Sequence, residues 1–290
     1  MAQLEQLTTT PAILGEGPCW HADEQVLYWV DIWGRALHRF HPDSGRDDRW
    51  DIGEMVGTVA PRKSGGLILG LERGFAFFDP TTQNIDHLAP LEDDTITRFN
   101  DGKCDPSGRF WCGSMDQQEE QSIGTLYRLD ANCNPQPFAT ELGISNGLGW
   151  NPDQTVMYFI DSPTKSVFAF DYDAESGDIS NRRVAFKLSD EDGWPDGMTT
   201  DTEGMIWLAE WGGARVCRRN PETGEILTQI DTPAPHTSAC CFGGPNMNEL
   251  YITTARKGMT DAQLEQFPEA GNLFRISTDV KGSPTHAFEG

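Results

Sequence analysis

Four oxygen-bearing residues recur at one position of a repeated pattern. Each stands five residues before a polar residue that begins a turn and leads into an apolar run: Glu16, Asn100, Asn146 and Asp196. Carboxylate and amide oxygens are hard ligands of the kind that hold divalent cations such as Ca²⁺, Mg²⁺ or Mn²⁺. Taken singly, each also suits a plain turn residue, because Asn-Gly and Asp-Gly are common in turns. Brought together, the four predict an oxygen-ligated cation site.

The elements that must position these residues repeat with them. Two weaker copies of the pattern place Gly57 and Ala239 at the same position, so six copies follow one another at steps of 41 to 50 residues. Each copy contains a short apolar strand, a Pro/Asp/Gly turn and a second strand rich in Trp, Tyr, Ile and Val, with further strand signals before the next copy. Such a period is typical of propeller blades. We therefore expect an all-β, six-bladed β-propeller that forms one domain over residues 1–290, with a short helix near 260–271.

A propeller would bring the six positions to one point, because the first strand of every blade lines the central channel. Gly57 and Ala239 would leave room there for a ligand. Arg98 lies two residues before Asn100, so strand alternation puts it on the same side. An arginine suits an oxygen-rich ligand, although a salt bridge at the rim is an equally good interpretation.

Charge and composition narrow the classes of partner. The formal net charge of -23 disfavours nucleic acid and anionic membranes. The chain has neither a leader-like start nor an apolar run approaching the ~18 residues of a membrane span, so we expect a cytoplasmic protein. Seven cysteines without a CxxC and six histidines without an HxH or HExxH motif predict neither a disulfide framework nor a zinc site of the usual kind.

Longer motifs resemble one known family. They are GEGPCW (15–20), RFNDGKCDPSGR (98–109), ISNGLGW (144–150), DSPTKSVFAFDYD (161–173), ISNRR (179–183), PDGMTTDTEGMIWLA (195–209) and CCFGG (240–244). Over nearly the whole chain these are similar to the regucalcin (senescence marker protein) and gluconolactonase family. The resemblance implies a six-bladed propeller that hydrolyses sugar-acid lactones with one divalent cation. It implies cation ligands at Glu16, Asn146 and Asp196, and substrate contacts from Arg98 and Asn100.

The sequence departs from the family pattern after the Gly-x-Met of residues 113–115. Vertebrate members resemble Met-Ala-Glu-Glu there, with the second Glu facing the sugar hydroxyls, whereas this chain has Met115 followed by DQQEE. In ungapped register Gln118 replaces that Glu; alternatively the loop slips and Glu119 or Glu120 reaches the sugar. Trp194 and Trp211 flank the Asp196 strand as either an apolar wall over a sugar ring or packing between blades.

The function that follows is hydrolysis of a neutral aldonolactone such as glucono-, xylono- or arabinono-lactone. We expect Asp196 to take a proton from the attacking water, and a cation that is Ca²⁺, Mn²⁺, Zn²⁺ or Fe²⁺. The alternatives are a calcium-binding regulatory protein of regucalcin type and a phosphotriesterase-like hydrolase. A WD-type interaction propeller lacks support because regular Gly-His and Trp-Asp pairs are absent. The expected state is a monomer or weak homo-oligomer.

Overall fold

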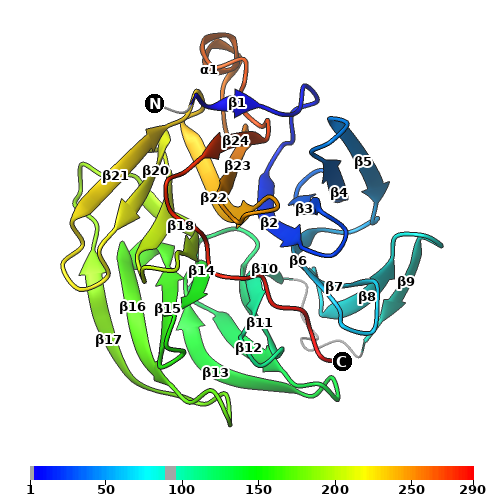
Figure 1. Ribbon diagram of the computed structural model, residues 1–290, viewed down its shortest axis with the longest axis vertical. Helices are drawn as coiled ribbons and strands as arrows, with labels where there is room; N and C mark the ends of the chain where they lie inside the picture. The colour runs from blue at the N-terminus through cyan, green and yellow to red at the C-terminus, as the bar shows by residue number, and fades with distance from the viewer. Residues whose placement is uncertain (1–2, 89–95) are drawn as a thin grey trace.

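Short antiparallel strands arranged around a central axis build the molecule. The computed structural model describes residues 3–88 and 96–290. Figure 1 shows the strands in groups that radiate from the axis. Two short helical segments accompany the strands in this part of the chain, η1 (Ser162–Thr164) and α1 (Asp261–Gln266). The expectation of an all-β, propeller-type fold is therefore confirmed.

Four of the groups are separate four-stranded sheets, each formed by consecutive strands. The first contains β2 (Gly15–His21), β3 (Val26–Asp31), β4 (Ala36–His41) and β5 (Arg46–Asp51). The second contains β6 (Val56–Pro61), β7 (Leu67–Leu71), β8 (Phe75–Asp79) and β9 (Asn84–His87). The third contains β10 (Thr97–Cys104), β11 (Phe110–Asp116), β12 (Gly124–Leu129) and β13 (Pro135–Leu142). The fourth contains β14 (Ser145–Trp150), β15 (Val156–Asp161), β16 (Ser166–Tyr172) and β17 (Ile179–Lys187).

The remaining strands correct the prediction of six separate blades. They are β18 (Trp194–Thr200), β19 (Ile206–Trp211), β20 (Arg215–Arg219), β21 (Ile226–Asp231), β22 (His236–Gly243), β23 (Glu249–Ala255), β24 (Phe274–Ser277) and β1 (Glu5–Gln6). All eight belong to one sheet, because Trp211 of β19 pairs with His236 of β22. The described strands thus form five sheets, four of four strands and one of eight. Strand and turn signals are local, and they carry no information on a bridge between neighbouring hairpins.

The inner strands of these groups pack side by side around the axis. Each of β2, β6, β10, β14, β18 and β22 contacts the next, and β22 contacts β2. Each of the six also carries a register irregularity at or beside the repeated polar position. A β-bulge bends the strand and redirects a side chain out of the regular alternation. The bulges therefore aim the repeated residues along the axis.

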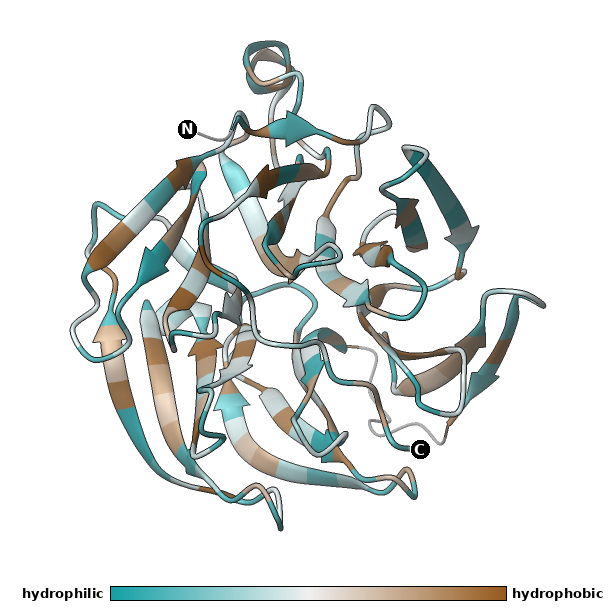
Figure 2. Cartoon of the chain, viewed as in Figure 1, coloured by the Kyte–Doolittle hydropathy of each residue, from teal (hydrophilic) through white to brown (hydrophobic). Residues whose placement is uncertain are grey.

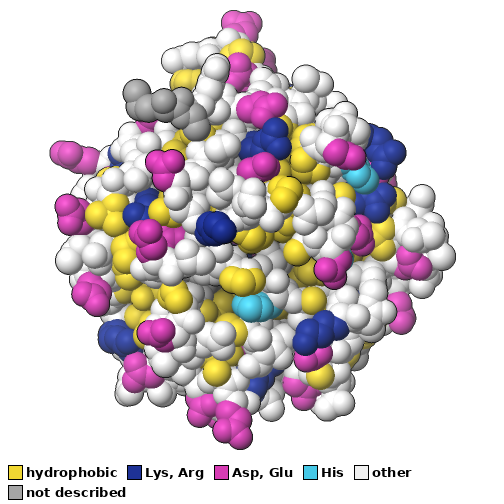
Figure 3. Space-filling view, in the orientation of Figure 1, with side chains coloured by type: hydrophobic (Ala, Val, Ile, Leu, Met, Phe, Trp, Pro, Cys, Tyr) yellow, Lys and Arg dark blue, Asp and Glu magenta, His cyan; other side chains and the backbone are white. Residues whose placement is uncertain are grey.

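Apolar side chains between neighbouring sheets form the core. Figure 2 shows hydrophobic residues banded along the strands, alternating with hydrophilic ones. Large rings meet across the sheet interfaces, as where Trp50 of β5 packs edge-on against Phe78 of β8 with centroids 5.7 Å apart. Figure 3 shows acidic side chains scattered over one face among Lys and Arg rather than gathered in one patch. On this face the acidic side chains therefore form no single patch.

The two ends of the chain are tied to the strands. Strand β1 pairs with β24, opposing Glu5 to Arg275. After β24 the chain crosses one face of the molecule (Figure 1), and the fully buried Phe288 bonds its backbone N–H to Pro61 O at 2.8 Å. This C-terminal crossing, residues 278–290, covers one end of the central channel. No helix in the described residues is both long and apolar enough to cross a bilayer.

The helix expected near 260–271 is present as α1. Thr260 accepts a hydrogen bond from the backbone N–H of Gln263, and the Gln263 side chain accepts one from the Thr260 backbone. This reciprocal capping box satisfies two backbone donors at the helix start. The helix therefore begins where its cap residue stands, and it lies at the periphery in Figure 1.

Candidate active site

The polar positions of the repeat open into a pocket of about 560 Å³ at one end of the channel. Its lining includes all four oxygen-bearing residues and two neighbours: Glu16, Arg98, Asn100, Asn146, Asp196 and Glu119. The bulges of β2, β10, β14 and β18 aim the four into one space. Residues up to 180 positions apart therefore share a single site.

Gly57 and Ala239 were expected to leave room for a ligand, but neither lines this pocket. A Cβ atom at Gly57 would clash with the backbone carbonyls of Phe99 and Asn100. Ala239 lies against Gly197 of the neighbouring inner strand. Small residues at these positions let adjacent inner strands approach closely, rather than leaving room for a ligand.

A chain of hydrogen bonds links the amides of the pocket. Arg98 Nη1 donates to Asn100 Oδ1 at 2.7 Å, and Asn100 Nδ2 donates to Asn146 Oδ1 at 3.0 Å. Asn146 Nδ2 donates to Ser162 Oγ at 2.9 Å, and Ser162 Oγ donates to Pro195 O at 2.6 Å. The chain runs from β10 through β14 and η1 to β18. It fixes the orientation of both amides, because each Nδ2 has an acceptor.

The two buried carboxylates of the pocket, Glu16 and Asp196, lack such partners among the described residues. Glu16 and Asp196 are each 6% exposed. Glu16 Oε2 accepts only the backbone N–H of Gly17, at 3.0 Å, and Asp196 has no hydrogen bond or ion pair with any other described residue. Burial, reinforced by repulsion from Asp101, raises the pKa of Glu16 to about 8. Burial and then repulsion from Glu16 raise the pKa of Asp196 well above its usual range.

This donor set fits a divalent cation. Two buried carboxylates without a counter-ion are expensive to ionise, and a cation would relieve both burial and mutual repulsion. The described residues contain no group of three or more His, Cys, Asp or Glu side chains suited to a metal. Neutral amide oxygens, with Asn146 in the pocket, would therefore complete the ligand set. Glu16, Asn146 and Asp196 would offer oxygen ligands, which match a hard cation.

The three candidates of the 118–120 loop lie differently with respect to the pocket. All three are exposed, but of them only Glu119 belongs to the pocket lining. The loop wraps around Asp116, whose carboxylate accepts the backbone N–H groups of Gln118 and Glu120, each at 3.1 Å. Glu119 has a positive φ of 62°, which turns the chain there. Its side chain, rather than that of Gln118, is the one presented to the pocket.

Further residues complete the pocket, and two of them, Trp194 and Trp211, were expected either over a sugar ring or between blades. Trp194 and Trp211 both line the pocket, and Trp211 stacks on His236 with centroids 4.1 Å apart. Burial lowers the pKa of His236. Ser162 lies inside the motif of residues 161–173, and its hydroxyl could have been read there as a partner for an amide. His236 and Lys257 also line the pocket but lie outside the repeated position, so no pattern pointed to them.

A second cavity occupies the other end of the channel. It is lined by the residues that follow the repeated positions, among them Gly17, Asp101 and Gly197, and is covered by residues 283–286 of the C-terminal crossing. Lys103 Nζ donates to Met198 O at 2.7 Å, and Asp101 Oδ1 accepts the N–H of Gly102 at 2.7 Å. The same inner strands thus serve an open pocket at one end and a covered cavity at the other.

Comparisons with known proteins agree with this geometry. Residues 14–256 match the family model described as SMP-30/Gluconolactonase/LRE-like region. Regucalcin of Danio rerio is 39% identical over 280 residues, covering 96% of this chain and 95% of its own. The putative sugar lactone lactonase YvrE of Bacillus subtilis (strain 168) is 36% identical over 282 residues, covering 97% of each. The crystal structure of a calcium-binding protein, regucalcin, from Agrobacterium tumefaciens superimposes with a TM-score of 0.95 at 28% identity, covering 100% of this chain and 98% of that one. The chain belongs to the SMP-30/gluconolactonase/LRE-like family.

Proposed function

We propose that this protein hydrolyses the lactone of a sugar acid to the open-chain acid. The observation that carries the proposal is the pair of buried carboxylates Glu16 and Asp196, which form no ion pair within the described residues and share an open pocket with the Arg98 guanidinium. Family membership and the relative named as a sugar lactone lactonase support the same reaction. We propose gluconic, xylonic or arabinonic lactones as substrates.

One divalent cation would be held by Glu16, Asn146 and Asp196. When bound, such a cation supplies Lewis-acid polarisation of a carbonyl oxygen. The side chains present here fit it because both carboxylates are already desolvated and the amide of Asn146 is oriented by Ser162. Ca²⁺, Mn²⁺, Zn²⁺ and Fe²⁺ are the candidates, with an all-oxygen set favouring the harder ions.

The chain's own side chains would transfer the proton and position the substrate. Asp196 takes a proton from the water that adds to the lactone carbonyl carbon, and it returns that proton to the ring oxygen when the C–O bond breaks. Arg98 is buried among oxygen acceptors and donates to Asn100, so this pair holds the substrate's oxygens at the pocket base. Trp194 and Trp211 flank the space for the ring. Positioning contributes strongly because a lactone is already an activated ester.

The experiment is a panel of aldonolactones and one phosphotriester, followed with a pH indicator in the presence and absence of chelator. Lactone turnover that is lost on chelation and restored by a divalent cation is expected. Cation binding without turnover would instead favour the alternative of a calcium-binding protein, which is how the similar structure from Agrobacterium tumefaciens is described. Turnover of the phosphotriester alone would favour the phosphotriesterase alternative.

A further inference from the structure

An ion pair crosses the mouth of the pocket. Lys257 Nζ donates to Glu119 Oε1, and both residues line the pocket. Glu119 lies in the loop between β11 and β12, whereas Lys257 follows β23. Figure 1 shows these two groups of strands on opposite sides of the central axis. The pair therefore spans the opening instead of bordering one side of it.

Both ends of this bridge are held by their surroundings. The backbone N–H of Lys257 donates to Ile13 O at 2.9 Å, and the N–H of Glu119 donates to Asp116 O at 3.1 Å. The ammonium also sits 4.9 Å from the ring centroid of Trp33, which is 47% exposed. The two charged groups are thus presented at fixed places over the pocket, which lowers the entropy lost when a ligand binds.

Stability does not explain the pair. The side chains of Lys257 and Glu119 are 19% and 36% exposed, and ion pairs with this degree of exposure contribute little to stability. An ammonium has three donors and a carboxylate about four acceptor sites. Within the described part of the chain, neither charged group has another hydrogen bond. Donors and acceptors are therefore left for a ligand at the same place.

We propose that the Glu119–Lys257 bridge recognises hydroxyl groups of the substrate, and that Lys257 is a specificity-determining residue. Hydroxyls both donate and accept, so they match a fixed ammonium beside a fixed carboxylate. The bridge is neutral as a whole, so it offers donors and acceptors without a net charge that would favour an ionic substituent over a hydroxyl. The inference rests on the proposed lactone hydrolysis, and it adds a role in substrate selectivity for Lys257, which lines the pocket from outside the repeated position.

The test compares D-glucono-1,5-lactone with δ-valerolactone, which has the same six-membered ring without hydroxyls. Lys257→Met removes the ammonium and keeps an unbranched stem against Trp33. We expect its KM for the gluconolactone to rise about 10-fold, as for loss of one hydrogen bond to a charged group, with kcat changed less than about 2-fold. Kinetics on valerolactone should stay unchanged. Glu119→Gln should show the same selectivity change, and the double variant should add little to either.

Two further variants guard this test. Lys63→Met removes the cation of an exposed ion pair with Glu289, outside the pocket, and should alter neither substrate's kinetics. Lys257→Arg keeps the charge and should retain the preference for the gluconolactone. If Lys257→Met does not fold, the comparison of Lys257→Arg with Glu119→Gln replaces it as the test.

Three results would overturn the inference. An equal change for both lactones would mean that the bridge acts on access or folding, and no change for either would mean that it does not touch the ligand. A wild-type protein that hydrolyses neither lactone would overturn the proposed function and the inference together. If the wild-type protein does hydrolyse these lactones, either of the first two results would overturn the inference alone.

Discussion

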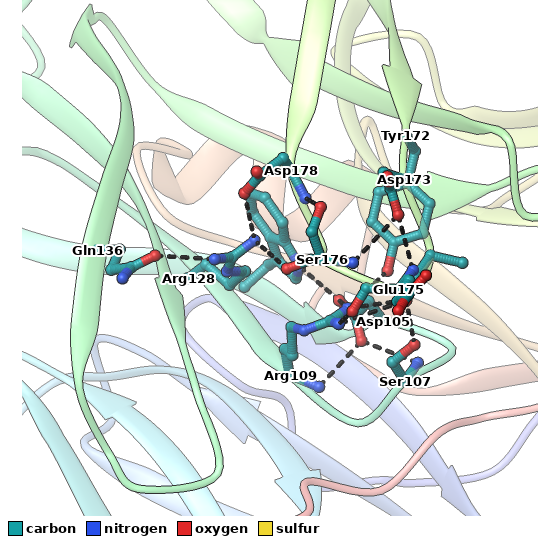
Figure 4. Close-up of polar contacts among 12 residues, drawn as sticks. Asp105, Ser107, Arg109, Arg128, Gln136, Tyr172, Asp173, Glu175, Ser176 and Asp178 are labelled. Atoms are coloured by element: carbon teal, nitrogen blue, oxygen red, sulfur yellow. Dashed lines mark hydrogen bonds and ion pairs between the residues drawn. The ribbon is translucent and has the colours of Figure 1, made fainter.

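The inner strands carry buried acids at both ends, and these acids differ in how many hydrogen-bond partners they have. At the turn end, Asp105 and Asp201 are fully buried and fully bonded. Figure 4 shows Asp105 among Ser107 and Arg109; its oxygens also accept the Trp111 indole N–H at 3.0 Å. Asp201 likewise accepts two backbone N–H groups, the Trp207 indole at 3.0 Å and Arg218 Nε at 2.7 Å.

At the pocket end, Glu16 and Asp196 are nearly as buried but have almost no partners. In the copy that contains Asp196 and Asp201, the repeat places one acid where neighbours satisfy it and, five residues earlier, another where they do not. A fold gains stability from the first arrangement and loses it from the second. Unsatisfied acids that persist at one end of the repeat indicate a ligand that completes them.

The largest expected effect comes from Asp196→Asn. Removing the proposed proton acceptor and cation ligand should lower kcat/KM for the preferred lactone by about 10³-fold, within the range for general base and metal-ion contributions. The free energy of unfolding without cation should not fall, because an unpartnered buried acid is replaced by a neutral amide. Steady-state kinetics and urea unfolding measure the two quantities. Wild-type turnover in this variant would remove Asp196 from the mechanism.

Asp201→Asn should show the opposite pattern. It breaks the buried pair with Arg218 and weakens the bond to Trp207, so we expect a loss of about 3 kcal/mol in unfolding free energy. Turnover per folded molecule should stay near wild type, since Asp201 does not line the pocket. Activity is compared after correcting for the folded fraction. A stable variant with lost turnover would contradict the division between the two ends of the strand.

Glu16→Gln addresses the cation directly. Loss of one of two formal charges should weaken divalent cation binding at least about 10-fold, by analogy with changes around metal ligands. Isothermal titration calorimetry on chelator-treated protein measures the affinity. Glu210→Gln is the matched control, because Glu210 is a fully buried glutamate paired with Arg215 and Arg219. Equal affinities in the wild type and Glu16→Gln would exclude Glu16 as a ligand.

The smallest effect is a pH dependence of the cation-free protein. Burial raises the pKa of Glu16 from 4.5 to about 8, so between these values the folded chain keeps a proton that the unfolded chain releases. Stability therefore falls as the pH rises through this window. We expect the chelated protein to lose a few degrees in Tm from pH 5 to pH 8, at roughly 2 to 4 °C per kcal/mol. Saturating cation should reduce this loss. Plots of Tm against pH that run parallel with and without cation would contradict the prediction.

The sequence predicted the strands and the repeated position because these depend on local signals. Turn residues and apolar alternation can be recognised within a short stretch of sequence, so Asn100 and Asn146 could be expected in one place. In the structure Asn100 Nδ2 lies 3.0 Å from Asn146 Oδ1. Gly17, Gly147 and Gly197 directly follow three of the polar positions and are the readable sign of the bulges there.

Contacts between distant loops could not be predicted in this way. The choice between Gln118 and Glu119 depends on how a loop wraps around Asp116, and Lys257 reaches the pocket from a segment with no repeated signal. The union of two hairpin groups through Trp211 and His236 is likewise a single bridge formed in space. Such features depend on tertiary geometry that no window of sequence contains.

The pairing of β1 with β24 has a consequence for biosynthesis. Because residues 5 and 6 hydrogen-bond to residues 274 and 275, the last sheet waits for nearly the whole chain to leave the ribosome. The side of the pocket that His236 and Lys257 line is therefore also completed late in synthesis. A partly synthesised chain can form the earlier sheets, but the ring of sheets around the pocket stays open until β1 pairs with β24.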